Sequence, residues 1–429
     1  MKKQITISQV ACAYEPEAFL TAFGFKGNKL TGVWQTVVGL WDGMDVGVGL
    51  GIQSVLWSDN RVFAAFGEDK SNEQMFRVTQ YAADLIKGKT FGAPQEILDF
   101  VFEDCCRFAA EVTGMNTTET FVLNALVPLD MAAWQLWARK TGADSFDAIF
   151  TGANHCEKLA NIPLITYGVP VDDVVRMAKE GICLFKIKLG CDPDGDGDLD
   201  KMLQWDKQRA LQIHRALQNL STPYTENGHI LYYFDANGRY DTKERLLELT
   251  SFLQQEGIAQ RTVLFEEPFA PENEVFVGDM GISFAADESA HSLHDVLRRI
   301  ELGYKALTLK PIAKTVTVTM RMAQAAREAG VACFCADLTV NPLMVEWNKN
   351  FAARLELLPG MKIGVVESNG AQNYIRWNEM KSYVPRKSTQ SDGSIYTLDE
   401  AFYQKAGGLY ETPQHYLQLL YQQNPDFMR

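Results

Sequence analysis

The chain has 429 residues, of which 46% are apolar and 22% are charged, as is typical of a globular protein with one large or two ordinary domains. Acidic residues outnumber basic residues, 54 against 41, so the formal net charge is −13. This excess of negative charge argues against nucleic acids and anionic membrane surfaces as partners. A small anionic substrate remains compatible with it, because a local group of lysines can oppose the overall charge.

The first part of the chain, residues 1–155, mixes strand-like and helical patterns. The segment 30–57 is β-like with turns, and helical patterns follow at 71–88, 94–114 and 127–142. The start, MKKQITISQV, has two lysines with no apolar run behind them, so it is a poor signal peptide. We find no run of 18 apolar residues that would span a membrane. We therefore expect an α+β capping domain and a cytoplasmic protein.

From residue 156 onward, short β-like runs alternate with helical stretches. Eight such runs lie at 162–168, 183–190, 230–238, 262–268, 282–289, 305–311, 331–337 and 362–370. Apolar strands that alternate with helices predict a parallel sheet covered by helices, and eight of them favour a closed barrel. We expect an α/β fold in which a (β/α)7β-type TIM barrel, residues 156–374, follows the capping domain. The aromatic-rich tail, 375–429, is expected to pack back on the cap.

Charged residues recur where these strands end, which is where barrels of this type carry their chemistry. In chain order they are Lys186, Lys188, Asp235, Glu266, Glu267, Asp287, Glu288 and Lys310. The first two lysines are two residues apart, so they point to the same side of their strand. Three consecutive strands that end in acids thus lie between two strands that end in lysines.

Carboxylates that converge on one barrel mouth repel each other and raise each other's pKa, and a divalent cation removes that conflict. Oxygen ligands without Cys or His indicate a hard ion, and Mg²⁺ is the usual choice beside an anionic substrate. Lysines on both sides of such an ion can act as proton donor and acceptor. The combination suits removal of the proton α to a carboxylate, through an enediolate that the metal stabilises, and its return on the other face.

At these residues the sequence resembles the enolase superfamily and, within it, the muconate lactonizing enzyme subgroup. The similarity covers about residues 120–370. It consists of a KxK on the second barrel strand, acids in FDANG, FEEP and ADES on the next three strands, and a lysine in LTLKP on the sixth. The order and spacing of the five elements make the resemblance specific.

The resemblance implies a role for each of six residues. The implied ligands of Mg²⁺ are Asp235, Glu266 and Asp287. Lys188 and Lys310 are the implied acid/base pair, and Lys186 is the implied electrostatic helper beside the substrate carboxylate.

The expected function is therefore Mg²⁺-dependent racemisation or epimerisation of a small carboxylate or amino-acid derivative. The same site could instead run a β-elimination, as in succinylbenzoate synthase, or a cycloisomerisation, as in muconate cyclisation. Two alternatives belong to other classes: a Schiff-base lyase that uses Lys310, and a non-catalytic carboxylate-binding relative. A homo-oligomer is expected, because such barrels commonly associate.

Three departures from the family pattern leave the substrate open. Gln135 stands where the family usually has Asp, and residues 21–70 do not match its usual first hairpin. The eighth strand, VVESNGAQ, lacks the DxD with which dipeptide epimerases hold an α-ammonium group, although Glu367 could substitute for it.

Other polar features of the sequence have two interpretations each. DPDGDGDLD, Asp192–Asp200, begins like a calcium loop but lacks its final Glu, so it is either a calcium site or a solvated insertion. His291 and His294 form an HxxH without a third ligand and are expected to be helix or surface residues. Cys333 and Cys335 lack zinc-site partners and are expected to be free thiols.

Overall fold

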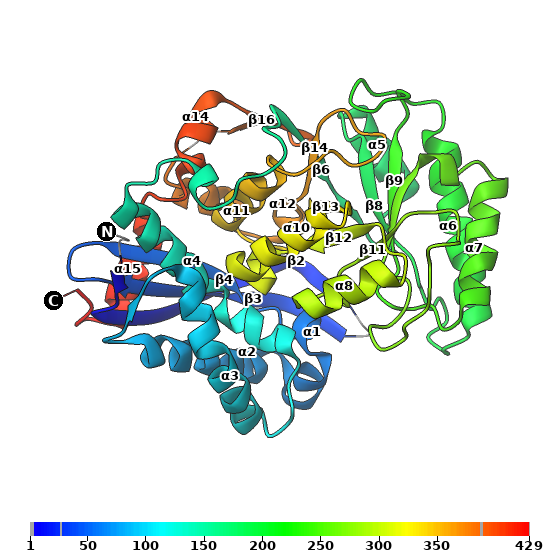
Figure 1. Cartoon of the computed structure of the whole chain (residues 1–429). Coiled ribbons are helices and arrows are strands. Elements are labelled where there is room, and N and C mark those ends of the chain that lie inside the picture. Colours follow the sequence, from blue (N-terminus) through cyan, green and yellow to red (C-terminus); the bar gives the residue numbers. More distant parts are fainter. Residues whose placement is uncertain (1–3, 26–27, 387–388, 429) are drawn as a thin grey trace.

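The computed structural model describes residues 4–25, 28–386 and 389–428. A cap of strands and long helices is followed along the chain by a barrel of parallel strands with helices outside it (Figure 1). Both chain ends lie on the side of the cap (Figure 1). The order of the two parts agrees with the sequence analysis, and the fold class is confirmed.

The cap contains an antiparallel sheet of order β2–β3–β4. Its strands are β2 (Gln9–Phe25), β3 (Asn28–Trp41) and β4 (Val46–Ile52), and a separate pair joins β1 (Ile5–Thr6) to β5 (Thr90–Phe91). Its helices are α1 (Val55–Ser58), α2 (Asn60–Ile86), α3 (Pro94–Thr113) and α4 (Glu119–Thr141). Strand β2 was not expected from the sequence. It contains Pro16, which an edge strand tolerates because one side of its backbone needs no partner.

Three glycines on β4 allow α4 to lie directly on the strand. Gly47, Gly49 and Gly51 alternate along β4, and a Cβ atom on Gly49 would lie 2.0 Å from the backbone oxygen of Pro128 in α4. Among the described residues α4 is also the one helix long and apolar enough to span a membrane, but 94% of that stretch is buried inside the protein. Helix α4 is therefore a core helix of the cap.

The barrel strands coincide with the eight expected runs. In chain order they are β6 (Lys158–Ile162), β7 (Leu164–Ile165), β8 (Leu184–Lys188), β9 (Leu231–Asp235), β10 (Thr262–Glu266), β11 (Phe284–Ala286), β12 (Ala306–Leu309), β13 (Ala332–Cys335) and β14 (Gly364–Glu367). All neighbours from β7 to β14 are parallel. Strands β6 and β7 form the first barrel strand, interrupted at Pro163. Because β6 pairs with β14 and β7 pairs with β8, the sheet closes on itself.

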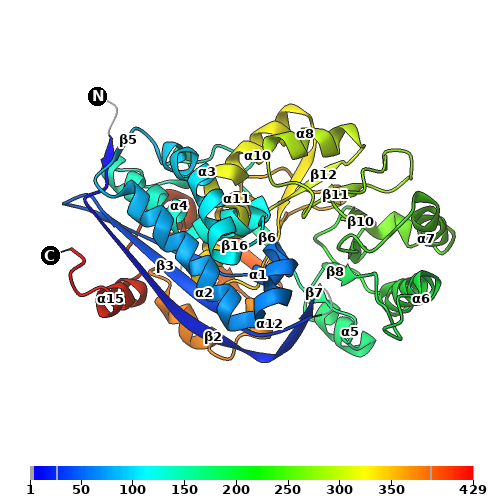
Figure 2. The ribbon, with the colours of Figure 1, turned by 90° about the horizontal axis from the view of Figure 1, so that it is seen from below.

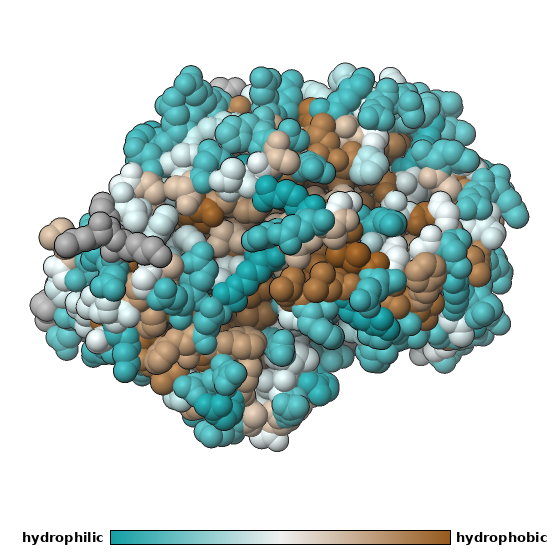
Figure 3. Space-filling view, in the orientation of Figure 1, coloured by the Kyte–Doolittle hydropathy of each residue, from teal (hydrophilic) through white to brown (hydrophobic). Residues whose placement is uncertain are grey.

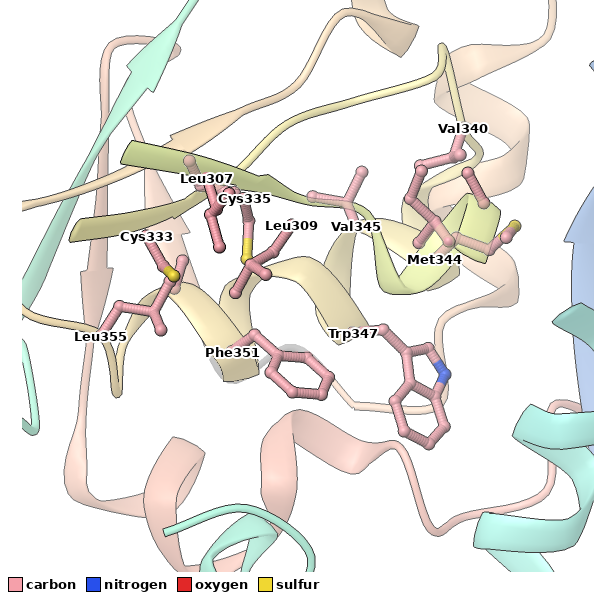
Figure 4. Close-up of a cluster of buried hydrophobic side chains, with 14 of the residues drawn as sticks. Leu307, Leu309, Cys333, Cys335, Val340, Met344, Val345, Trp347, Phe351 and Leu355 are labelled. Carbon is pink, nitrogen blue, oxygen red and sulfur yellow. The ribbon is translucent and has the colours of Figure 1, made fainter. Parts of the chain in front are cut away.

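Helices cover the outside of the barrel. The longer ones are α5 (Val171–Lys179), α6 (Leu199–Leu217), α7 (Lys243–Gln255), α8 (Leu293–Glu301), α10 (Val316–Glu328) and α11 (Pro342–Ala352). Seen from below, α5, α6 and α7 lie on the side away from the cap sheet (Figure 2). Figure 4 shows Trp347 and Phe351 of α11 near the side chains of β12 and β13, with Cys333 and Cys335 in the same cluster. Both cysteines are free thiols.

Short helices complete the chain between and after these elements. They are α9 (Pro311–Lys314), α12 (Gly370–Asn373), α13 (Trp377–Met380), α14 (Glu400–Gln404) and the 3₁₀ turns Phe146–Ala148, Ala259–Arg261, Lys381–Tyr383 and Ala406–Gly408. Helix α9 begins directly after β12 with a proline in its first turn, where the missing N–H costs no hydrogen bond.

The tail contacts both parts of the molecule. Strand β16 (Ile395–Leu398) pairs with β15 (Thr389–Ser391) and, antiparallel, with β6. One edge of β6 is available to β16 because β7, which follows the break at Pro163, pairs with β8 instead of β6. Helix α15 (Gln414–Gln423) packs on β2 and β3 of the cap. The segment 395–398 thus extends the barrel sheet, a correction to the expectation that the whole tail packs on the cap.

Polar contacts join the cap to its neighbours. The carboxylate of Asp130, on α4, accepts hydrogen bonds from the backbone N–H and the hydroxyl of Thr317 in the barrel, at 3.0 and 2.6 Å. Burial raises the pKa of Asp130 to about 6. Gln135 accepts from Val48 N at 2.7 Å and donates to the carbonyl of Leu409 at 2.7 Å, so it connects the cap to the tail.

Apolar side chains also reach the surface. Figure 3 shows brown residues gathered in the middle of one face, and Leu293 and Leu297 of α8 are each half exposed. The homo-oligomer expected from the sequence remains a prediction.

The close contact between β4 and α4 predicts that Gly49→Ala destabilises the protein. The added methyl group would overlap backbone atoms of α4, which cannot move without separating the helix from the sheet. We expect a loss of about 1–3 kcal/mol of unfolding free energy, measured by thermal or chemical denaturation. Gly168→Ala is the control, because a Cβ atom there meets no atom within 4 Å and its backbone angles suit any residue. Equal stabilities of the two variants would contradict this account.

Candidate active site

Lys186 and Lys188 point into the barrel from β8. Strand residues alternate between the two faces, so Phe185 and Ile187 belong to the outer core while the two lysines lie inside. The Lys186 ammonium lies 3.0 Å from Asp235, 3.2 Å from Glu266 and 3.3 Å from Glu367. Burial by itself lowers the pKa of Lys186, but these carboxylates outweigh it and raise the pKa well above its usual value.

Lys188 faces the end of the neighbouring strand. Its ammonium lies 2.6 Å from the Asp235 carboxylate and also donates to the side-chain oxygen of Asn237. Asn237 donates in turn to Glu288 at 2.8 Å, so it links Lys188 to the acids of the next strands. Asn237 and Glu267 both have positive φ angles, 44° and 39°, and such backbone strain in non-glycine residues concentrates at functional sites.

Lys310 lies across the site, directly after β12. Its ammonium donates to Asp287 and lies 4.6 Å from the centre of the Trp57 ring, which comes from the cap. Burial lowers the pKa of Lys310, but Asp287 and Glu288 outweigh this effect and raise it. Lys314, one helical turn further on, donates to the Asp287 backbone oxygen at 2.6 Å and contacts its carboxylate at 3.2 Å.

Three acids between the lysines lie close enough to share a metal ion. Glu266, Asp287 and Glu288 each offer one oxygen, and these oxygens all lie within 4.8 Å of one another. Two of the three sequence-predicted ligands, Glu266 and Asp287, therefore belong to the cluster. Asp235, the third, ends β9 in the same cavity, where Lys186 and Lys188 contact its carboxylate. Glu288 was expected from the sequence to be a neighbour of the ligands.

The electrostatics of this cluster fit a cation. Burial raises the pKa of Glu266 to about 7, and burial together with Glu288 raises the pKa of Glu267 to about 8. One oxygen of Glu267 and one of Glu288 are buried without a hydrogen-bond partner among the described residues. The carboxylate oxygens at this position thus outnumber the hydrogen-bond donors that contact them. Such oxygens are the ligands that a hard divalent ion prefers.

A cavity opens above these groups. Lys186, Lys188 and Lys310 line its floor, and Phe19, Leu30, Val33 and Trp57 of the cap form an apolar wall. Further lining comes from the ends of strands seven and eight. The sequence analysis indicated only that residues 21–70 and the eighth strand depart from the family pattern, and both contribute to this lining. It did not single out the individual apolar residues, because a Phe or Leu facing a cavity has the same sequence pattern as one in a core.

Two acids, Asp337 and Glu367, lie on the side of strands seven and eight. Asp337 accepts hydrogen bonds from Asn369 N at 2.6 Å and Val340 N at 3.2 Å, and burial and the nearby Glu367 raise its pKa to about 6. Glu367 contacts Lys186 and accepts from the Asn369 amide at 2.7 Å. The sequence analysis noted Glu367 but missed Asp337. Asp337 could have been found from its position, because it is an acid that closely follows a barrel strand.

The other polar motifs lie outside this cavity. In the segment Asp192–Asp200, Lys201 contacts Asp194 and Asp196 at 2.6 and 2.7 Å, and calcium binding there remains a hypothesis. His294 is exposed on α8, and burial lowers the pKa of His291 to about 3. Neither histidine belongs to the acid cluster.

Comparison with known proteins gives one match in sequence and many in structure. No family model matches the chain. An aromatic dipeptide epimerase of Herpetosiphon aurantiacus is 32% identical over 124 residues, which are 28% of this chain and 34% of that protein. The sequence match thus spans about a third of that relative's length.

The structural similarity covers nearly the whole chain. A mandelate racemase/muconate lactonizing protein from Herpetosiphon aurantiacus superposes with a TM-score of 0.66 and 17% identity, over 93% of this chain and 98% of that one. A dipeptide epimerase from Enterococcus faecalis, complexed with Mg and the dipeptide L-Leu-L-Tyr, superposes with a TM-score of 0.63 and 15% identity, over 94% and 99%. The chain therefore has the fold of the mandelate racemase/muconate lactonizing proteins of the enolase superfamily, which confirms the resemblance found in the sequence.

Proposed function

We propose that this protein racemises or epimerises a carboxylate substrate by removing its α-proton with one lysine and returning a proton with another. The observation that supports the proposal is the placement of Lys188 and Lys310. They line one cavity from β8 and from the end of β12, and the acid-bearing strands β9, β10 and β11 lie between them. A substrate held over the acids would present opposite faces of its α-carbon to the two amines.

The residues present fit a magnesium ion. Asp235, Glu266 and Asp287 are the proposed ligands, and Glu288 is a further candidate because its carboxylate clusters with those of Glu266 and Asp287. Bound Mg²⁺ would stabilise the negative charge that develops on the substrate carboxylate when the α-proton leaves. The Lys186 ammonium, held among three carboxylates, would add a fixed positive charge beside that carboxylate.

Lys188 and Lys310 would act in opposite protonation states. The lysine that accepts the α-proton must be neutral, and the lysine on the other face must hold a proton to donate. The configuration of the substrate decides which lysine has which role. Because both lysines are buried, a proton moved between substrate and lysine would be partly shielded from bulk water.

The cavity favours a substrate with a cationic group and an apolar body. Asp337 and Glu367 lie together at one side, and an ammonium group between them would relieve the repulsion that raises the pKa of Asp337. Phe19, Leu30 and Val33 offer an apolar surface on the cap side. A dipeptide with an apolar side chain has both a cationic amino group and an apolar body. The name of the similar aromatic dipeptide epimerase indicates a substrate of this kind.

The first prediction concerns the reaction itself. Incubation in D₂O with Mg²⁺ and a library of dipeptides, including aromatic ones, should replace the α-hydrogen of at least one compound, as followed by NMR. Removal of the metal with EDTA should abolish the exchange, and added Mg²⁺ should restore it. Exchange that persists without metal would contradict the proposal. A new double bond or ring in the product would favour elimination or cycloisomerisation, and metal binding without turnover would favour a non-catalytic relative.

The second prediction separates the two lysines. Lys188→Met and Lys310→Met keep the apolar stems but cannot carry a proton. Each variant should lose exchange about 10²–10⁴-fold for the substrate enantiomer whose α-hydrogen faces the missing amine. Neither should interconvert the enantiomers. Lys201→Met is the control, because Lys201 pairs with Asp194 and Asp196 in an exposed loop. Wild-type interconversion by either site variant would exclude the two-base arrangement.

The third prediction tests the cationic group of the substrate. Asp337→Asn removes one negative charge from the side of strands seven and eight while keeping the size of the side chain. The KM of a dipeptide with a free amino group should rise about tenfold, a change equivalent to about 1.4 kcal/mol. The same dipeptide with an acetylated amino group is the control and should show no such rise. An equal effect on both compounds would place the ammonium group elsewhere.

A further inference from the structure

A further buried acid, Asp206, lies behind the site and is not part of the cavity. Asp206, on α6, is fully buried. Both oxygens of its carboxylate lie 2.9 Å from the backbone nitrogen of Gly190, and the Tyr240 hydroxyl donates to it at 2.7 Å. It forms no salt bridge with any residue in the described part of the chain, and burial raises its pKa to about 7. A buried carboxylate that forms no salt bridge costs stability, so its presence here needs a reason beyond packing.

The partner of this carboxylate lies two residues beyond Lys188. Gly190 has a φ angle of +80°, and a Cβ atom there would lie 2.6 Å from the side chain of Arg239, so the turn requires glycine. The turn is also held by Leu189, whose N–H donates to the Asp235 backbone oxygen at 2.9 Å. Asp206 thus fixes the turn that directly follows β8, the strand that carries Lys188.

Tyr240 extends this connection to two more strand ends. Its backbone N–H donates to the carbonyl of Pro268 at 3.0 Å, while its hydroxyl contacts Asp206. Tyr240 follows β9 and Pro268 follows β10, so one buried group on α6 is joined to the ends of β8, β9 and β10. Those three strands carry Lys188, Asp235 and Glu266.

Helix α6 does not need this acid to stay on the barrel. Its apolar face is already buried, through Met202, Leu203, Ala210, Ile213 and Leu217. A carboxylate suits the position for another reason: in its ionised form it has only acceptor oxygens, and the groups that converge on it are donors. An asparagine of the same size would turn an N–H group toward one of those donors.

From these contacts we propose that Asp206 is a positioning residue, which fixes the Gly190 turn and thereby the placement of the Lys188 amine over its substrate. The inference rests on the proposed function of Lys188. A displacement of a reacting group by up to about 1 Å lowers the rate of the chemical step without weakening substrate binding.

The test compares two variants of this contact with a matched control. Asp206→Asn reverses one hydrogen-bond direction, and Tyr240→Phe removes only the hydroxyl donor. With the dipeptide found in the exchange screen and saturating Mg²⁺, we expect kcat of Asp206→Asn to fall about 10–100-fold, with KM within threefold of wild type. Tyr240→Phe should show a smaller fall of the same kind. Asp130→Asn makes the same chemical change in another fully buried carboxylate, at the cap, and should leave kcat unchanged.

Each outcome supports or overturns the inference. A wild-type kcat in Asp206→Asn, or an equal fall in Asp130→Asn, would show that the acid has no positioning role. Should Asp206→Asn fail to fold, Tyr240→Phe decides in the same way. Should the wild-type protein exchange no α-hydrogen, the proposed function fails, and crystal structures of the wild type and Tyr240→Phe test the inference separately. The Lys188–Asp235 contact of 2.6 Å should then lengthen in the variant, and an unchanged contact would overturn the proposal.

Discussion

The mutual neutralisation of charges buried at one end of the barrel is the constraint on which this structure depends. Lys186 has three carboxylates within 3.3 Å, and Asp287 is held by both Lys310 and Lys314. Each of these charges would be costly if buried alone. The pairing is nevertheless incomplete, because Glu267 and Glu288 keep buried oxygens without partners among the described residues. The protein therefore carries a surplus of negative charge at the position where a cation and a charged substrate would bind.

The rest of the fold keeps these charges in place and limits the access of water. Alternation along the barrel strands directs one set of apolar residues toward the helices, whereas the inward-facing positions carry apolar residues such as Leu184 and, nearer the strand ends, the charged residues. The cap then adds an apolar wall and places Trp57 beside the ammonium of Lys310. Electrostatic interactions are stronger where water is excluded, so the cap increases the effect of every charge below it. Buried polar contacts such as Asp130 with Thr317 also join cap and barrel, at residues that do not line the cavity.

The shape and charge of the cavity also narrow the range of compatible chemistry. Asp337 and Glu367 place negative charge on the side of strands seven and eight, whereas the cap side is apolar. Glu367 is paired with Lys186, whereas Asp337 has no salt bridge within the described residues. Strand eight lacks the DxD pattern, but carboxylates from two neighbouring strands, Asp337 and Glu367, lie at that side of the cavity, where the proposed function would place the substrate's ammonium group.

The sequence by itself determined the barrel, the order of its strands and the residues at their ends, because strand periodicity and strand-end position are local properties of the chain. It therefore predicted roles for Lys186, Lys188, Asp235, Glu266, Asp287 and Lys310, and all of these except Glu266 line the cavity. Only the tertiary structure decided which acids share a cluster, that Glu288 lies beside Glu266 and Asp287, and that Asp337, Trp57 and Asp206 surround the site. It also placed β16 on the barrel sheet. These relations depend on side-chain directions and on contacts between residues far apart in the chain, which a local pattern does not encode.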